Sequence, residues 1–172
     1  MYPGNAFGKS GRQIWLSTLI LLAGLTLSIP AKADEIVQPA KGQSVYLPVY
    51  SHLWHGNLGA RGLPEILQLS ALISIRNTDP ANSIRVLSAR YYDTSGKALR
   101  EFVPTAKTLA PLATLELFVE RREAEGGSGA NFVIRWQSDT PVSPPVTEAI
   151  HADLNSVRTV SFVTTGRPIR GE

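Results

Sequence analysis

The sequence predicts an all-β chain, folded as a single β-sandwich with an immunoglobulin-like arrangement of about eight short antiparallel strands. Three observations lead to this fold class. Apolar and polar residues alternate over several short segments, turn-forming residues recur at intervals of roughly 8–12 residues, and no amphipathic segment is long enough for a major helix. A closed barrel is the alternative architecture. The chain has 172 residues, of which 43% are hydrophobic and 18% charged, which is enough apolar material for one core.

The first 33 residues have the pattern of an export signal. Lys9 and Arg12 precede an uncharged apolar run over residues 14–27, and Ala31 and Ala33 follow it at the spacing of an A-x-A site. The apolar run is shorter than the roughly 20 residues of a membrane-spanning helix, and this order of features is typical of a cleaved signal peptide. We expect cleavage after Ala33, with an uncleaved N-terminal anchor as the alternative. Either way the sequence predicts a periplasmic or secreted protein.

Composition excludes several classes of protein. The chain has no cysteine, so it has neither disulfides nor a thiol-linked lipid anchor, and we expect no stable membrane anchor after signal cleavage. Lys9, Arg12 and Lys32 precede Asp34 without any acidic residue, and they leave 14 basic against 14 acidic residues in the remainder. This balance argues against a globally basic nucleic-acid binder, so we expect no nucleic-acid partner.

The domain organisation follows from these segments. The expected parts are the signal peptide at 1–33, a polar lead at 34–43, the β-sandwich domain at 44–166 and a C-terminal tail at 167–172.

Strands and turns alternate through the first half of the sandwich. Residues 44–50 form an edge strand, because Pro48 lacks the N–H that a central strand needs. Leucine, isoleucine and alanine recur at every second position over 67–75, the period of a half-buried strand. Asparagine, aspartate, proline and glycine mark the turns that follow. The sequence therefore predicts, in order, a turn at 77–80, a strand at 84–92, a turn at 93–96 and a pairing segment at 97–103.

The second half continues this pattern. A turn at 109–112 precedes an alternating strand at 113–120. The charged residues 121–125 and the glycines after them predict a solvated loop rather than a helix. The remaining expected elements are a strand at 132–137, a proline-rich connector at 141–145, and a hairpin of 146–154 with 157–165 around Asn155 and Ser156.

The loop at 50–56 is the most unusual local sequence. It places His52 and His55 three residues apart beside Trp54. Together with the distant His151, these imidazoles would make a three-ligand set for zinc or copper. The alternative is that the histidines cap the end of the sandwich, with His151 on a solvent-facing strand surface. We predict no cofactor, and zinc or copper at His52, His55 and His151 is the alternative.

The glycine-rich segment 126–131 allows two interpretations. Successive glycines let backbone N–H groups converge on an anion, or let a partner approach closely. A phosphate-binding loop also needs a lysine and a following helix, which are missing here. Ser128 with Asp139 or Asp153 lacks the context of a hydrolase nucleophile. A flexible loop is the simpler interpretation, and we predict no catalytic residue.

Two tyrosines close the predicted strand 84–92. Adjacent residues on a strand point to opposite faces, so one of Tyr91 and Tyr92 is expected in the core. The other, beside Arg85, Arg90 and Arg100, is suited to contact a partner or a glycan.

Four motifs make the chain resemble a known family. They are VYSH with HG at 49–56, SIRNTDP at 74–80, YYDTSGK at 91–97 and GGSGANF at 126–132. The chain is similar, over about residues 46–165, to an uncharacterised family of exported bacterial proteins catalogued as a domain of unknown function. The resemblance implies an envelope or secreted protein and no activity, cofactor or catalytic residue. Members are often lipoproteins, and this chain departs from that pattern because it lacks a cysteine.

The sequence therefore predicts a non-enzymatic binding module of the cell envelope that uses loops at one end of the sandwich. Its partner would be an envelope protein, a glycan or a small ligand. An exported metal-binding protein is the alternative, and an envelope hydrolase fits less well. The candidate binding residues are Tyr50, Ser51, His52, Trp54, His55, Gly127, Ser128 and Asn131.

Overall fold

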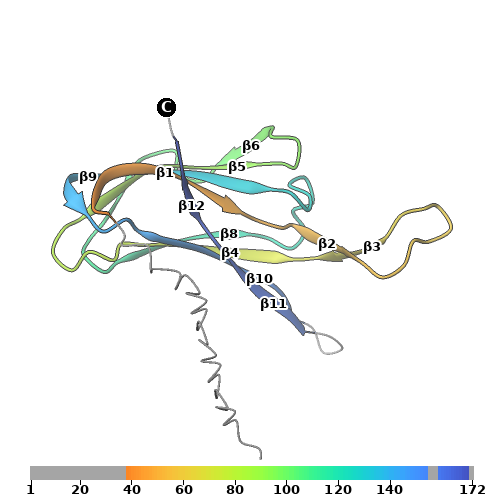
Figure 1. Ribbon diagram of the computed structural model, residues 1–172. Helices are drawn as coiled ribbons and strands as arrows, with labels where there is room; N and C mark the ends of the chain where they lie inside the picture. Colours follow the sequence, from red (N-terminus) through yellow and green to blue (C-terminus); the bar gives the residue numbers. More distant parts are fainter. Residues whose placement is uncertain (1–37, 155–158, 171–172) are drawn as a thin grey trace, which may run out of the picture. The chain divides into compact units, whose positions relative to one another are not determined.

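The computed structural model describes residues 38–154 and 159–170. It consists of short strands along which buried and exposed side chains largely alternate (Figure 1). Twelve strands and no helix occur in these residues, and the strands pair antiparallel. The described residues contain no helix with the length and apolarity needed to cross a bilayer. The all-β prediction is confirmed, although with more strands than expected. The predicted export signal at 1–33 lies outside the described residues.

The larger sheet has the order β12-β1-β9-β5-β6, with β7 also paired to β5. β1 is therefore not the edge strand that its proline predicted. Pro48 is its last residue, so the missing N–H falls where pairing ends, and β12 covers residues 44–46 on the other side. The strands are β1 (Ala40–Pro48), β5 (Ile84–Tyr92), β6 (Ala98–Glu101), β7 (Lys107–Leu109), β9 (Asn131–Val142) and β12 (Arg167–Ile169).

Three features of this sheet differ from the sequence-based expectation. β7 and β12 are strands in segments that carried no strand pattern, because each has only three residues and takes its structure from a neighbour. β9 runs on to Val142, through Pro141 of the expected connector. A strand of three residues is too short to show an alternating pattern, and a proline argues against a strand in the sequence.

The second sheet has the order β11-β10-β4-β8. The predicted C-terminal hairpin forms with the register Glu148↔Thr165 to Leu154↔Thr159. Its expected turn around Asn155 lies outside the described residues. The strands are β4 (Ser70–Arg76), β8 (Thr114–Val119), β10 (Val146–Leu154) and β11 (Thr159–Thr165).

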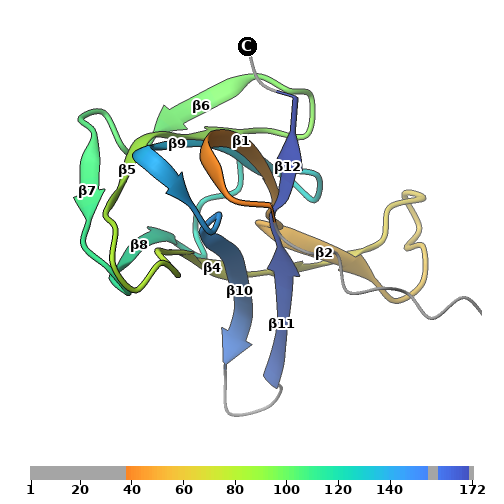
Figure 2. The same cartoon turned by 60° about the vertical axis from the view of Figure 1, so that its left-hand side comes forward.

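A separate two-stranded sheet consists of β2 (His52–His55) and β3 (Glu65–Gln68). We call residues 52–68 the arm. Figures 1 and 2 show that the hairpin and its connecting loop extend away from the strands of the other two sheets. The predicted strand at 67–75 is divided at Leu69, whose N–H donates to the Ser51 carbonyl (2.9 Å). The first part belongs to the arm and the second to the four-stranded sheet.

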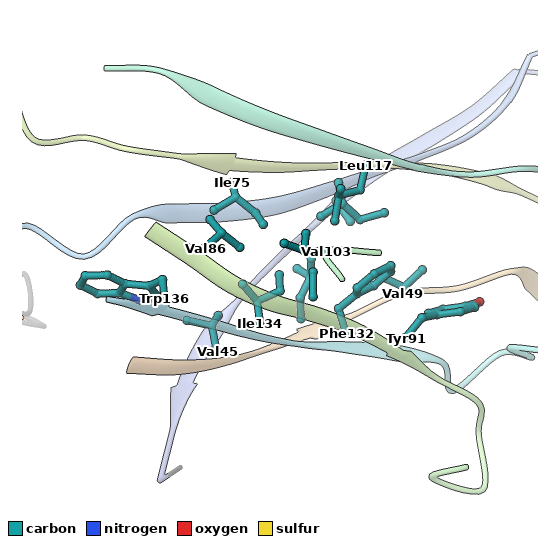
Figure 3. Close-up of a cluster of buried hydrophobic side chains, with 14 of the residues drawn as sticks. Val45, Val49, Ile75, Val86, Tyr91, Val103, Leu117, Phe132, Ile134 and Trp136 are labelled. Carbon is teal, nitrogen blue, oxygen red and sulfur yellow. The ribbon is translucent and has the colours of Figure 1, made fainter. Parts of the chain in front are cut away.

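One hydrophobic core unites the two larger sheets. Phe132 is fully buried in this core beside Tyr91 (Figure 3), and its ring centroid lies 5.0 Å from that of Tyr91 and 5.1 Å from that of Phe102. Tyr91 is the predicted core tyrosine, and Tyr92 is half-buried. Apolar side chains on one face of each sheet fill the remaining space, among them Val45, Leu47, Ile73, Ile75, Val86, Leu117, Ile134, Trp136 and Ala149.

The SIRNTDP motif forms a hydrogen-bonded turn before β5. The buried Asn77 amide donates to the carbonyls of Asn82 and Ala110, both at 2.9 Å. Backbone N–H groups of Ala81 and Asn82 donate to Asp79 and lower the pKa of its carboxyl. The polar side chains of Asn77 and Asp79 therefore stabilise the turn.

Candidate functional site

The loops predicted at 50–56 and 126–131 lie against each other. Ser51 N–H and Ser51 Oγ both donate to the Gly127 carbonyl at 3.1 Å, and Gly127 N–H donates back to Ser51 Oγ at 2.9 Å. Ser51 is 1% exposed. Two segments 76 residues apart in the chain therefore meet at one end of the molecule, as the single-site prediction requires.

The YYDTSGK motif joins the same place through Thr94. Its N–H (2.9 Å) and Oγ1 (3.0 Å) both donate to the Gly126 carbonyl, and Gly129 N–H donates to Thr94 Oγ1 (3.0 Å). Thr94 lies two residues after the end of β5, in the turn that begins at Asp93. We call Ser51, Thr94, Gly126, Gly127 and Gly129 the loop junction.

The glycines of the junction are explained by close approach. A Cβ on Gly126 would overlap the Tyr91 hydroxyl, and one on Gly127 would lie 2.5 Å from Thr94 Oγ1. Gly127 also has a φ of +80°, which a side chain disfavours. The neighbour that approaches closely is thus another part of the same chain.

Tyr91 links the junction to the charged loop at 121–125. Its hydroxyl donates to Glu123 Oε2 at 2.7 Å, while Glu123 Oε1 accepts the N–H of Glu125 at 2.7 Å. Burial and the neighbouring carboxylate raise the pKa of Tyr91. The charged loop is therefore fastened to the core at Glu123, although most of it is exposed as predicted.

The hydroxyl of Ser51 is not available as a nucleophile. His52 Nδ1 lies 3.5 Å from Ser51 Oγ, which superficially resembles a serine and its general base. However, the hydroxyl is buried and its proton is donated to the Gly127 carbonyl. Ser128 is half-buried in the adjoining loop. Asn131 begins β9 and pairs with Pro48 and Tyr92, so it is a strand residue rather than a loop residue.

The arm presents apolar side chains to solvent. Trp54 is 64% exposed and aligned across the hairpin with Ile66, which is 55% exposed. Leu58 and Leu63, on the loop between the strands, are 70% and 64% exposed. These residues line an open groove of about 1,020 Å³. Contiguous exposed apolar surface of this kind marks interaction sites.

His151 supports the base of the arm from inside. Its Nε2 accepts the Tyr50 N–H at 3.1 Å, and its ring stacks on Phe162 at 4.6 Å with an interplanar angle of 8°. The side chain is fully buried, so the expected solvent-facing position is wrong. Its neighbours on β10, Ile150 and Leu154, take the outer face instead. Burial lowers the pKa of His151 to about 4.

The three histidines do not form the metal site considered from the sequence. His52 lies on the Trp54 face of the arm, with ring centroids 6.4 Å apart. His55 alternates to the opposite face and lies 3.8 Å from Glu65. Across residues 38–154 and 159–170, no group of three His, Cys, Asp or Glu side chains is placed to hold a metal ion.

Sequence reasoning missed the apolar half of the arm, Leu58, Leu63 and Ile66. The segment NLGARGLP at 57–64 alternates leucines with glycines and a proline, which indicates a loop but not its exposure. Leucines in a loop are normally buried against the domain. The hairpin projects from the other strands (Figure 2), and these three side chains are 55–70% exposed.

Comparison with known proteins adds a family and no activity. No curated protein matches this chain. Among solved structures, the crystal structure of Thermotoga maritima 1070 is similar over 76% of this chain and 97% of that one, at 14% identity and a TM-score of 0.41. Residues 42–169 match the family described as "Protein of unknown function (DUF3124)". The chain belongs to the DUF3124 family, and the resemblance to a domain of unknown function is confirmed.

Proposed function

We propose that this chain is an exported, non-enzymatic binding module with an immunoglobulin-like β-sandwich, which captures an extended polypeptide segment of another envelope protein in the groove of its arm. The observation that carries the proposal is the group of four exposed apolar side chains, Trp54, Leu58, Leu63 and Ile66.

The energetics of this surface suit reversible binding. Burying an exposed aliphatic or aromatic side chain contributes roughly 1.5–3 kcal/mol, and each of these four is already partly covered. Their combined contribution is then roughly 4–8 kcal/mol, most of which offsets the translational and rotational entropy lost on association. Additional backbone hydrogen bonds would bring the affinity into a functional range.

The strand edges of the arm favour a polypeptide over a lipid. In the described part of the chain, β2 pairs with β3 alone, so each strand leaves one edge of backbone N–H and C=O groups available. Such groups are costly to place in hydrocarbon, whereas an added strand satisfies them. Peptide binding at a strand edge with side chains in a groove is a common recognition mode.

The junction supports the non-enzymatic part of the proposal. Ser51, whose Oγ lies 3.5 Å from His52 Nδ1, has its hydroxyl buried and hydrogen-bonded to the Gly127 carbonyl. A nucleophile must instead reach its substrate. The basic residues, the apolar run and the Ala31-Lys32-Ala33 site at the N-terminus support export.

Photo-crosslinking in living cells tests the proposal. A photoreactive phenylalanine analogue is placed at Ile66 in the full chain and irradiated in the native host. The matched control position is Leu112, which is 67% exposed and lies in the turn before β8. We expect discrete protein adducts from Ile66 and none of the same mass from Leu112.

Other adducts would contradict the proposal in distinct ways. Adducts to lipid or glycan alone would identify a different partner class. Adducts only at twice the mass of the chain would indicate self-association. Identical patterns from Ile66 and Leu112 would show that the arm has no selective partner.

A further inference from the structure

The outer face of the six-stranded sheet contains a second feature, a basin of about 290 Å³. Its lining residues lie on or directly after four strands, β12, β1, β9 and β5, which are neighbours in the sheet, and Figure 2 shows the course of these strands. The side chains that line it include Arg90, Arg135 and Arg170, together with Ser44 and Tyr92. The arm contributes no residue to it, so the inference below is independent of the proposed function.

Sheet register brings these residues together from distant parts of the sequence. Arg135 is aligned with Ser44 on β1 and with Ser88 on β5. Arg90 is aligned with Val133, two residues before Arg135 on the same strand. Residues that alternate with them point into the core, so this set shares the solvent face. No linear motif contains the arrangement.

The charges in and around the basin are unbalanced. Glu101 lies 3.5 Å from Arg90 Nε, and it accepts hydrogen bonds from Ser88 Oγ (2.6 Å) and Ala89 N–H (2.7 Å). Burial raises the pKa of Glu101, but these hydrogen bonds and Arg90 outweigh it, so the pKa is lowered overall. Among the described residues, Glu101 therefore pairs with Arg90, and no carboxylate forms an ion pair with Arg135 or Arg170.

This arrangement has the chemistry of an anion site. Like charges on one face of a sheet repel each other and destabilise it unless a counter-charge is present. Guanidinium groups donate paired hydrogen bonds that match phosphate and carboxylate oxygens. Ser44, 9% exposed, adds a hydroxyl donor at the basin. We propose that the basin binds a phosphate-type oxyanion, carried either by a free ion or by the headgroup of an anionic lipid.

Calorimetric titration of the purified full protein with inorganic phosphate tests the site. Sodium chloride at equal ionic strength is the reference titrant, because it reports non-specific charge screening. We expect saturable phosphate binding with a dissociation constant below about 1 mM. The double substitution Arg135→Gln with Arg170→Gln should weaken it at least tenfold.

A matched control separates the site from net charge. Arg61→Gln with Arg122→Gln removes the same charge from exposed arginines outside the basin, and it should leave binding within twofold of the wild type. A third variant, Ser44→Asp, places a carboxylate in the basin. It should abolish phosphate binding and raise the melting temperature, an outcome that a misfolded variant cannot imitate.

Vesicles distinguish the two sources of the oxyanion. Flotation with phosphatidylglycerol vesicles is compared with flotation on phosphatidylcholine vesicles. Phosphate binding without flotation assigns the site to a free ion, and flotation on phosphatidylglycerol alone assigns it to a lipid headgroup. In both cases the effect must be lost in the Arg135/Arg170 variant. The inference would be overturned if the protein neither bound phosphate nor floated on phosphatidylglycerol vesicles. It would also be overturned if the Arg61/Arg122 control lost binding as much as the Arg135/Arg170 variant.

Discussion

Ser51 and Trp54 are three residues apart in the chain, yet they belong to regions of opposite character. Ser51 is buried in the loop junction and hydrogen-bonded to Gly127, whereas Trp54 projects from the arm with 64% of its surface exposed. The polar groups of the loop junction form hydrogen bonds with one another. The arm has exposed apolar side chains and, within the described residues, strand edges that pair with no other strand. The difference teaches that residues of the family motifs supply the hydrogen bonds of the scaffold, whereas three of the four exposed apolar residues of the arm, Leu58, Leu63 and Ile66, lie outside those motifs.

The largest expected effect comes from Gly126→Ala in the junction. The added Cβ would overlap the Tyr91 hydroxyl and disrupt its hydrogen bond to Glu123. Overpacking and loss of a charged hydrogen bond together should lower the free energy of unfolding by about 4 kcal/mol. Urea unfolding followed by circular dichroism measures this loss.

The matched control is Gly62→Ala in the arm. Nothing lies within 4 Å of a Cβ added there, although the φ of +71° disfavours alanine. The expected loss is about 1 kcal/mol. Equal losses at Gly126 and Gly62 would break the distinction between scaffold and arm.

The pH dependence of stability sharpens the comparison through the histidines. Burial lowers the pKa of His151 to about 4, against about 6.5 in the unfolded chain. The unfolded state therefore binds more protons between these values. The contribution of His151 to the free energy of unfolding is therefore fully present above about pH 6.5. It declines by about 3 kcal/mol as the pH falls to about 4.

Urea midpoints between pH 4 and pH 7 measure this effect. The slope should be largely lost in His151→Phe, which cannot titrate. It should persist in His52→Gln with His55→Gln, because both of these residues belong to the arm. A slope that disappears in the double arm variant would contradict the assignment.

A smaller effect is expected for Ser51→Ala. The substitution removes a donor to the Gly127 carbonyl and an acceptor for the Gly127 N–H. The Gly127 carbonyl keeps the Ser51 N–H, but the Gly127 N–H loses its acceptor, which should cost about 2 kcal/mol. Ser128→Ala, in the same loop, should change stability by less than about 0.5 kcal/mol. Thermal and urea unfolding measure both variants. Equal losses in the free energy of unfolding for Ser51→Ala and Ser128→Ala would show that Ser51 is not a special support of the loop junction.

The smallest effect on stability is expected for Trp54→Ala. Its side chain is exposed, so the free energy of unfolding should change by less than about 0.5 kcal/mol. A loss above about 2 kcal/mol would show that Trp54 belongs to the scaffold.

The sequence predicted the all-β class and most long strands because these depend on local alternation. Residues 84–92 and 146–154 were bounded correctly. β7 and β12 were missed because each has three residues and is defined by its neighbour. β1 was misplaced at an edge because a proline at the end of a strand and one at a sheet edge look alike in sequence.

The sequence-based hypothesis of a single site placed the 50–56 and 126–131 loops at one end of the sandwich, because the most reactive residue types fall on them, and the two segments do meet at Ser51 and Gly127. Their roles did not follow from the sequence, because burial decides whether Ser51 binds a partner or holds Gly127. His151 shows the same limit, since alternation with Ile150 assigned it to the wrong face. The basin arginines come from β5, from β9 and from the residue after β12, and no local pattern relates them.

The most direct test of the central claim compares crosslinking from Ile66 in two backgrounds. Trp54→Ala changes the arm, and Ser128→Ala changes a motif residue beside the junction. We expect the yield of the partner adduct to fall at least tenfold with Trp54→Ala and to stay within twofold of the wild type with Ser128→Ala. Loss of the adduct with Ser128→Ala and its retention with Trp54→Ala would place the binding surface on the glycine-rich loop at 126–131. That result would contradict the account.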